Sequence, residues 1–126
     1  MKTAFFTFLT AIVIALTTNS AQAGAYDREA ADLRAAWNLM AQCAPVYDGH
    51  RFHAMWRVTD AGKIIGVNLG GFRSGTLNKE QARTKLIQAR ELVQRTQASL
   101  AAKKKPVAAD KCARAVRQLN AAIAIN

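Results

Sequence analysis

Two histidines stand three residues apart, at His50 and His53, in a stretch that also holds Asp48. Residues at i and i+3 of a helix lie on one face, so both imidazoles could bind the same cation. Imidazole and carboxylate groups are ligands that zinc and copper accept. The pair lacks a third ligand at a fixed spacing, which metalloprotease motifs have. A copper or zinc binding module that uses His50, His53 and Asp48 is therefore the alternative function and not the leading one.

Enzymatic chemistry has less support in this sequence. A Gly-x-Ser-x-Gly nucleophile motif is absent, and so is the Cys-x-x-Cys-His motif that attaches haem. Asp27, Glu29 and Asp32 are close together, but they fall in the first turns of an expected helix, where we predict that they are exposed. The sequence therefore predicts a protein that is not an enzyme and that has no cofactor.

Residues 1–23 have the features of a secretory signal peptide. Lys2 supplies the positive start, an apolar run follows, and the small-residue sequence Ala-Gln-Ala at 21–23 predicts cleavage before Gly24. The apolar run is shorter than the roughly 20 residues of a membrane-spanning helix. We expect a periplasmic or secreted chain with a single domain at 24–126 and no transmembrane segment in its mature form.

Three segments of that domain have apolar residues at the spacing of one helix face. The first starts at Asp27 and ends before Pro45, the next begins at Asn78 and ends before Pro106, and the last covers about 107–125. Asn78 and Gln81 match a capping box. Trp37 and Met40 are expected in the core.

The segment at 48–65 is ambiguous. Ala54, Val58 and Ala61 fit a helix that Asp48 would cap, whereas Asp60 and Gly62 fit the turn of a β-hairpin over 52–69. We favour the helix, because an isolated two-stranded ribbon is only marginally stable and no other segment is predicted to be a strand. The fold class is then all-α, an antiparallel four-helix bundle.

Cys43 and Cys112 are the two cysteines of the chain, and an even count in an exported protein favours a disulfide. In an up-down-up-down bundle, the end of the first helix and the start of the fourth lie at the same pole. We therefore predict a Cys43–Cys112 disulfide.

Charge indicates an anionic partner. The net charge is +10, and removal of residues 1–23 takes away only Lys2, which leaves +9. Such a balance favours binding to acidic surfaces. The arginines of the third helix alternate with glutamine and aliphatic residues, so specific nucleic-acid binding is not expected. The candidate binding residues are Arg51, Arg83, Arg90, Lys111, Arg114 and Arg117.

Short motifs resemble a loosely defined set of small exported helical proteins. They lie at 47–55 (Tyr-x-Gly-His-Arg-x-x-Ala-Met), 61–67, 81–92 and 115–123. The resemblance implies that the Tyr-x-Gly-His-Arg segment opens the second helix, and it implies no activity. The leading interpretation is thus a non-enzymatic exported bundle, of inhibitor, immunity or accessory type, that binds an anionic or protein partner in the cell envelope.

Overall fold

The computed structural model describes residues 24–45 and 49–125, and their regular elements are all helical. The helices pack against one another and are α2 (Asp27–Ala41), α3 (His50–Ile64), α4 (Lys79–Ala102) and α5 (Pro106–Ala124). The all-α fold class is confirmed. The signal-peptide prediction at 1–23 and the role of Asp48 lie outside the described residues.

Hydrogen bonds at both ends fix the relative direction of α2 and α4. Ala44, just after α2, donates its backbone N–H to the carbonyl of Leu77, just before α4, at 2.9 Å. At the other end, Lys103 Nζ, just after α4, donates to the carbonyl of Ala25, just before α2, at 2.7 Å. The two helices therefore run in opposite directions.

Two further contacts place α5. Arg83, in the first turn and a half of α4, donates to the carbonyl of Ile123 near the end of α5 at 2.8 Å. His50 at the start of α3 lies 2.8 Å, through Nδ1, from Gln118 Oε1 of α5. Helix α5 is thus antiparallel to both α3 and α4, and it follows that α3 and α4 run in the same direction.

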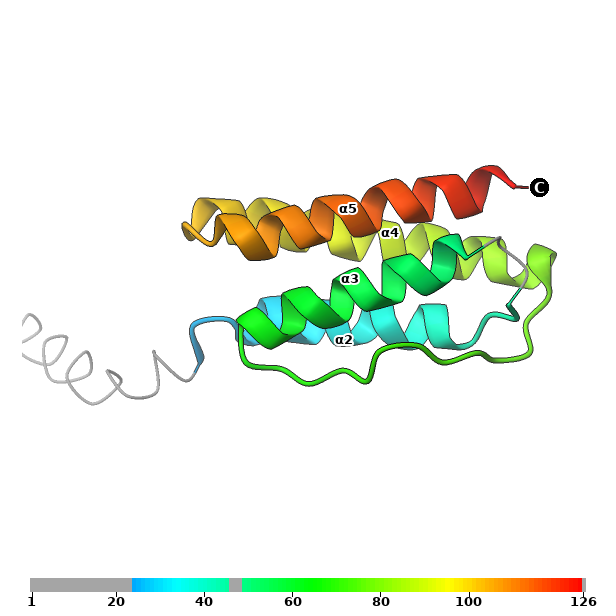
Figure 1. Cartoon of the computed structure of the whole chain (residues 1–126), viewed down its shortest axis with the longest axis horizontal. Helices are drawn as coiled ribbons and strands as arrows, with labels where there is room; N and C mark the ends of the chain where they lie inside the picture. The colour runs from blue at the N-terminus through cyan, green and yellow to red at the C-terminus, as the bar shows by residue number, and fades with distance from the viewer. Residues whose placement is uncertain (1–23, 46–48, 126) are drawn as a thin grey trace, which may run out of the picture.

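The connection between α3 and α4 makes this topology possible. After α3 ends, residues 66–78 (the crossing segment) return along the length of the bundle before α4 begins (Figure 1). The up-down-up-down order predicted from the sequence is therefore wrong. A long crossover replaces the short turn that this order needs.

The predicted disulfide is wrong for the same reason. Cys43 and Cys112 are both free and buried. Cys43 follows the end of α2, where α4 begins, whereas Cys112 lies in the second turn of α5, next to the end of α4. The crossover moves the two cysteines to opposite halves of the bundle, so their sulfur atoms are not within bonding reach.

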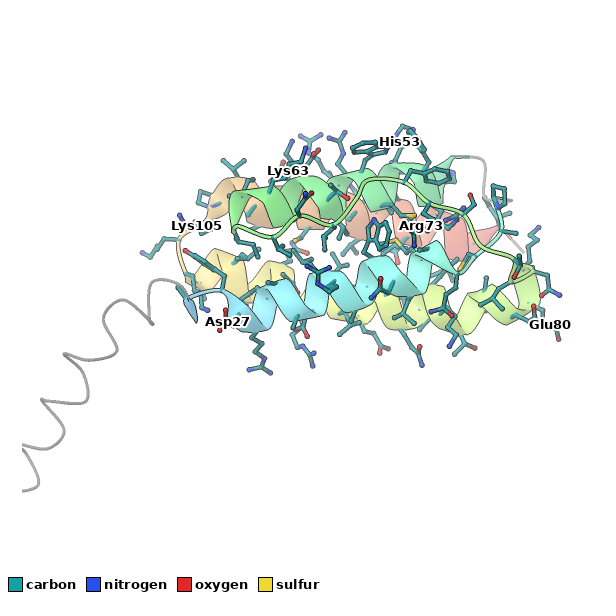
Figure 2. The ribbon with its side chains drawn as sticks, turned by 90° about the horizontal axis from the view of Figure 1, so that it is seen from below. Asp27, His53, Lys63, Arg73, Glu80 and Lys105 are labelled. Atoms are coloured by element: carbon teal, nitrogen blue, oxygen red, sulfur yellow. The ribbon has the colours of Figure 1, made fainter. Side chains whose placement is uncertain are left out.

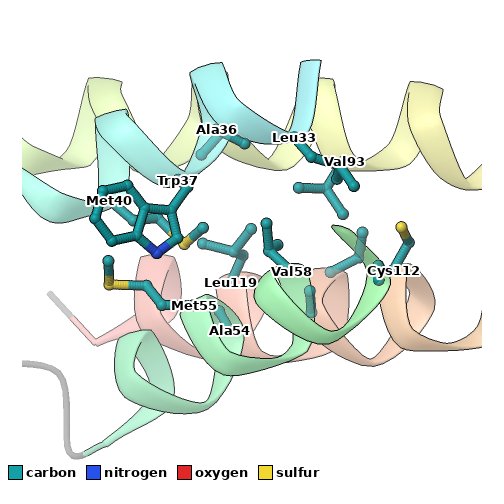
Figure 3. Close-up of a cluster of buried hydrophobic side chains, with 14 of the residues drawn as sticks. Leu33, Ala36, Trp37, Met40, Ala54, Met55, Val58, Val93, Cys112 and Leu119 are labelled. Carbon is teal, nitrogen blue, oxygen red and sulfur yellow. The ribbon is translucent and has the colours of Figure 1, made fainter. Parts of the chain in front are cut away.

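The core lies between the four helices and consists mainly of alanine, leucine, valine and methionine. Figure 3 shows side chains of α2 facing those of α3 and α5, with Trp37 and Met40 on the α2 side. Trp37 is 6% exposed and Met40 is fully buried, so the prediction that both belong to the core is confirmed. Many buried alanines let the helices approach closely, and this packing holds α3 in place.

The helical prediction for 48–65 is confirmed, with α3 beginning at His50. Gly62, which supported the hairpin alternative, is buried in the last turn of α3. A Cβ atom there would lie 2.9 Å from Val67 Cγ1, so the glycine allows the chain to fold back against its own helix. The capping box at the start of α4 is also confirmed, with Asn78 Oδ1 accepting from the Gln81 N–H at 2.9 Å.

Candidate functional site

His50 and His53 lie at the start of α3, and Arg51 between them is a buried charged residue. Its side chain is 2% exposed. Its Nη1 donates to the carbonyls of Met40 at 2.9 Å and Arg73 at 2.8 Å, and Nη2 donates to Ser74 Oγ at 2.9 Å. The guanidinium carbon also lies 5.0 Å from the ring centre of Phe72. Arg51 was predicted as a binding residue, and the structure shows that its side chain is buried and ties the crossing segment to α2 and α3.

Gly71 makes a second attachment of the crossing segment. Its carbonyl accepts from Trp37 Nε1 at 2.7 Å, and its N–H donates to Thr59 Oγ1 at 3.1 Å. The residue has φ of +76°, and a Cβ atom there would lie 2.7 Å from the Trp56 ring. The Trp56 ring therefore lies so close to the backbone at residue 71 that only glycine fits there.

These attachments position a group of exposed aromatic side chains, Phe52, Trp56 and Phe72, which we refer to as the aromatic surface. The ring centres of Phe52 and Phe72 are 5.0 Å apart, and those of Phe52 and Trp56 are 6.3 Å apart. Their exposed fractions are 41%, 40% and 36% for Phe52, Trp56 and Phe72. Large apolar side chains that gather on a surface commonly mark an interaction site.

The two histidines do not form a metal site with other described residues. His50 is engaged with Gln118, whereas His53 is exposed and its ring centre is 5.3 Å from that of Phe52. Within residues 24–45 and 49–125, no three His, Cys, Asp or Glu side chains gather where they could hold a metal ion. The third ligand that the sequence lacked is therefore not supplied by the described part of the fold.

Three of the five predicted basic residues of α4 and α5 make hydrogen bonds or ion pairs within the bundle. Arg83 bonds Ile123, and Arg90 donates to Asn120 Oδ1 at 3.0 Å across the seam between these helices. Arg114 forms an i,i+4 ion pair with Asp110 at 2.8 Å, and this pair lowers the pKa of the Asp110 carboxyl. Lys111 is half-buried and Arg117 is exposed on α5.

Glu29 departs from the predicted exposure of the first acids, because it is 2% exposed. Ser99 donates to its carboxylate, and Lys103 Nζ lies 2.8 Å from Glu29 Oε2. Burial acts to raise the pKa of Glu29, but the bonds from Lys103 and Ser99 outweigh it and hold that pKa below the ordinary value of 4.5. The Glu29 cluster therefore joins α2 to α4.

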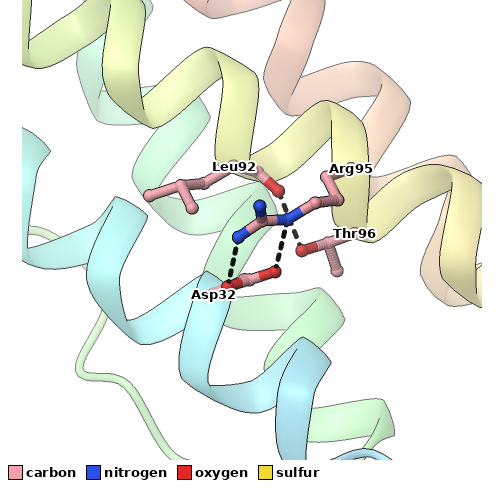
Figure 4. Close-up of polar contacts among 4 residues, drawn as sticks. All are labelled: Asp32, Leu92, Arg95 and Thr96. Atoms are coloured by element: carbon pink, nitrogen blue, oxygen red, sulfur yellow. Dashed lines mark hydrogen bonds and ion pairs between the residues drawn. The ribbon is translucent and has the colours of Figure 1, made fainter.

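Asp32 also joins these two helices. Arg95 donates to both of its carboxylate oxygens, at 2.9 and 3.0 Å (Figure 4). The three acids of α2 that were predicted to be exposed therefore differ in burial. Asp27 is exposed, Asp32 is mostly buried in an ion pair, and Glu29 is in the interior.

The aromatic surface was not predicted, although its signal was present. Phe52 and Trp56 are one turn apart and fall outside the buried stripe of Ala54, Val58 and Ala61. The helical period of 3.6 residues alone therefore predicts that they lie on the outer face of α3. Phe72 could not be found in this way, because it comes from an irregular segment.

Comparisons with models of known protein families, with curated proteins and with solved structures find no match to this chain. As for the described helices, none combines the length and the apolar composition needed to cross a bilayer.

Proposed function

We propose that this chain is a non-enzymatic exported protein that binds an anionic or protein partner in the cell envelope through its aromatic surface. One observation carries the proposal. Phe52, Trp56 and Phe72 are exposed together on α3 and the crossing segment. Soluble domains seldom leave such a group in water without a use for it.

Rigidity supports the same proposal. The crossing segment is bound through Arg51 to Met40, through Gly71 to Trp37 and Thr59, and through Leu77 to Gln42 and Ala44. A surface already held in one arrangement loses less conformational entropy on binding. The aromatic surface is thus preorganised for binding.

Net charge adds long-range attraction. Export would leave a chain of charge +9, which attracts anionic partners over a distance. The arginines at 83, 90 and 114 contribute to this field while they bond within the bundle. We therefore place the contact itself on the aromatic surface and assign the basic faces of α4 and α5 to attraction over distance.

Site-specific cross-linking tests the proposal. A photoreactive residue replaces His53 beside the aromatic surface, or Gln94 on the exposed face of α4 as the matched control. Each purified protein is illuminated in envelope extract. We expect adducts from position 53 that decrease as salt rises from about 50 to about 300 mM, because screening shortens electrostatic attraction. Equal adducts from both positions would contradict a binding role for this surface.

A further inference from the structure

The exposed apolar side chains of α3 continue beyond the aromatic surface along the same helix. Phe52 and Trp56 are one turn apart, and Ile64, which is 41% exposed, lies two turns further on. Phe72 lies against Phe52 from the crossing segment. Together these side chains form an apolar strip that winds partly around the exposed side of α3, because Ile64 is turned by roughly 80° from Trp56.

Cations accompany this strip. Arg57 and Lys63 lie on α3 and Arg73 on the crossing segment, whereas Asp60 is the acid on the same stretch of α3. Figure 2 shows Lys63 on α3 and Arg73 on the segment that runs across the bundle, with His53 near the start of the helix. The Arg73 guanidinium carbon lies 5.5 Å from the ring centre of Trp37, which helps to hold that charge beside the strip.

The strip is also shallow. A dent of about 50 Å³ lies at Phe52 and Phe72. A larger groove of about 300 Å³ is on other helices, where Leu39, Leu92 and Glu91 line it. The dent at Phe52 and Phe72 is small beside that groove, so the strip is shallow at this point.

We infer that this strip docks on the surface of a bilayer that contains anionic phospholipid. The inference rests on the proposed function, because it names the partner of the same surface. Tryptophan and other aromatic rings are favourable at the level of the lipid headgroups, where half-exposed rings reach without deep insertion. Arginine and lysine beside them are attracted by anionic lipid phosphates. A bilayer needs neither a pocket nor a fitted shape, so it suits this shallow strip better than a protein partner does.

Vesicle binding tests the inference, and the native tryptophans report it. Trp37 is 6% exposed and Trp56 is 40% exposed, so quenching by brominated lipid reports mainly on Trp56. The mature chain is mixed with vesicles of roughly three parts phosphatidylcholine to one part phosphatidylglycerol, or with phosphatidylcholine alone. We expect binding and quenching with the anionic vesicles, and binding that is weaker by about tenfold or more with the neutral ones.

A matched pair of variants locates the contact. Phe52→Ser/Ile64→Ser removes two apolar groups from the strip and keeps Trp56, whereas Val107→Ser removes an apolar group that is 61% exposed on α5. We expect the double variant to lose about tenfold or more in vesicle affinity and the Val107 variant to stay within about twofold. Circular dichroism on each variant verifies that the helices are retained.

Two outcomes overturn the inference. Equal vesicle affinity of the double variant and the wild type would show that the strip is not the contact. Absence of binding to the anionic vesicles, together with protein adducts from position 53, would replace the lipid by a protein partner and leave the proposed function standing. Failure of both experiments would reject the proposed function as well.

Discussion

Arg51 places a charge in the interior and joins three parts of the chain there. Its guanidinium donates hydrogen bonds to the carbonyls of Met40 and Arg73 and to the hydroxyl of Ser74. Arg51→Met keeps much of the volume but leaves these acceptors without that donor. We expect a loss of about 3 kcal/mol in the free energy of unfolding, measured by chemical denaturation.

The control is Arg117→Met, which removes an exposed cation from α5. It should change the stability by no more than about 0.5 kcal/mol. Similar stability of the Arg51 variant and the wild type would show that the crossing segment does not depend on this guanidinium.

The two cysteines give a prediction about reactivity. Burial raises the pKa of Cys112 to about 12 and also raises that of Cys43, although the charges of Arg51 and Lys85 partly oppose the effect at Cys43. Thiolate is the reactive form, so both groups should be inert near pH 8 in the folded protein. A thiol reagent should label neither cysteine in buffer and both in denaturant without reductant. Labelling of fewer than two thiols in denaturant would support the Cys43–Cys112 disulfide that the sequence predicted.

At the scale of elements, Gly71 determines how closely the crossing segment approaches α3. Gly71→Ala meets both an unfavourable φ of +76° and the Trp56 ring. Gly66→Ala is the matched control, because its φ is +94° and nothing lies within 4 Å of a Cβ atom there. The control should cost about 1 kcal/mol for its backbone alone.

The Gly71 variant should cost about 1 to 3 kcal/mol more than the control, because the ring must move. Acrylamide quenching of Trp56 should rise in the Gly71 variant and not in the Gly66 variant. Equal losses of stability and equal quenching in the two variants would mean that Trp56 does not pack against the crossing segment.

The helices could be predicted from the sequence, whereas their order in space could not. Periodic apolar residues and the capping box at Asn78 determine α2, α4 and α5 locally. The direction of α4 relative to α3 depends on residues 66–78, whose path is fixed by contacts from distant residues such as Arg51 and Trp37. No local pattern contains these contacts, so the predicted Cys43–Cys112 disulfide assumed the wrong topology. The same contacts create the aromatic surface, of which only the part on α3 was within reach of periodicity.

At the scale of the whole molecule, Glu29 makes stability depend on pH at the end where α2 meets α4. Its pKa is below 4.5 in the folded chain, so its contribution is complete above the unfolded value and is lost as pH falls through the folded value. Glu29→Gln should cost about 1 to 2 kcal/mol at pH 7, since Lys103 is half-exposed and water weakens the pair.

Thermal unfolding from pH 7 to acid checks this dependence. Below pH 4.5 the wild type should lose stability faster than the Glu29→Gln variant. Glu80→Gln, which changes an exposed acid in the first turn of α4, should keep the acid sensitivity of the wild type. Parallel curves for the Glu29 variant and the wild type would contradict the assignment.

The crossover itself can be tested by its length. Helix α3 has 15 residues, which correspond to about 22 Å, and the connection must cover that distance to reach the start of α4. Deletion of residues 67–76 leaves four residues between α3 and α4, and these reach no further than about 17 Å. The shortened chain should not fold as a monomer, and exchange of helices between two copies is the expected result on gel filtration with light scattering.

Replacement of residues 67–76 by ten glycine and serine residues separates the effect of the length of the connection from the effect of its contacts. This control loses the bonds of Gly71, Arg73 and Ser74, but it can still reach α4, so it should remain helical and monomeric at lower stability. A shortened chain that folds as a monomer with the stability of the wild type would mean that α3 and α4 are neighbours joined by a turn, which is the up-down-up-down order that brings Cys43 and Cys112 to the same end.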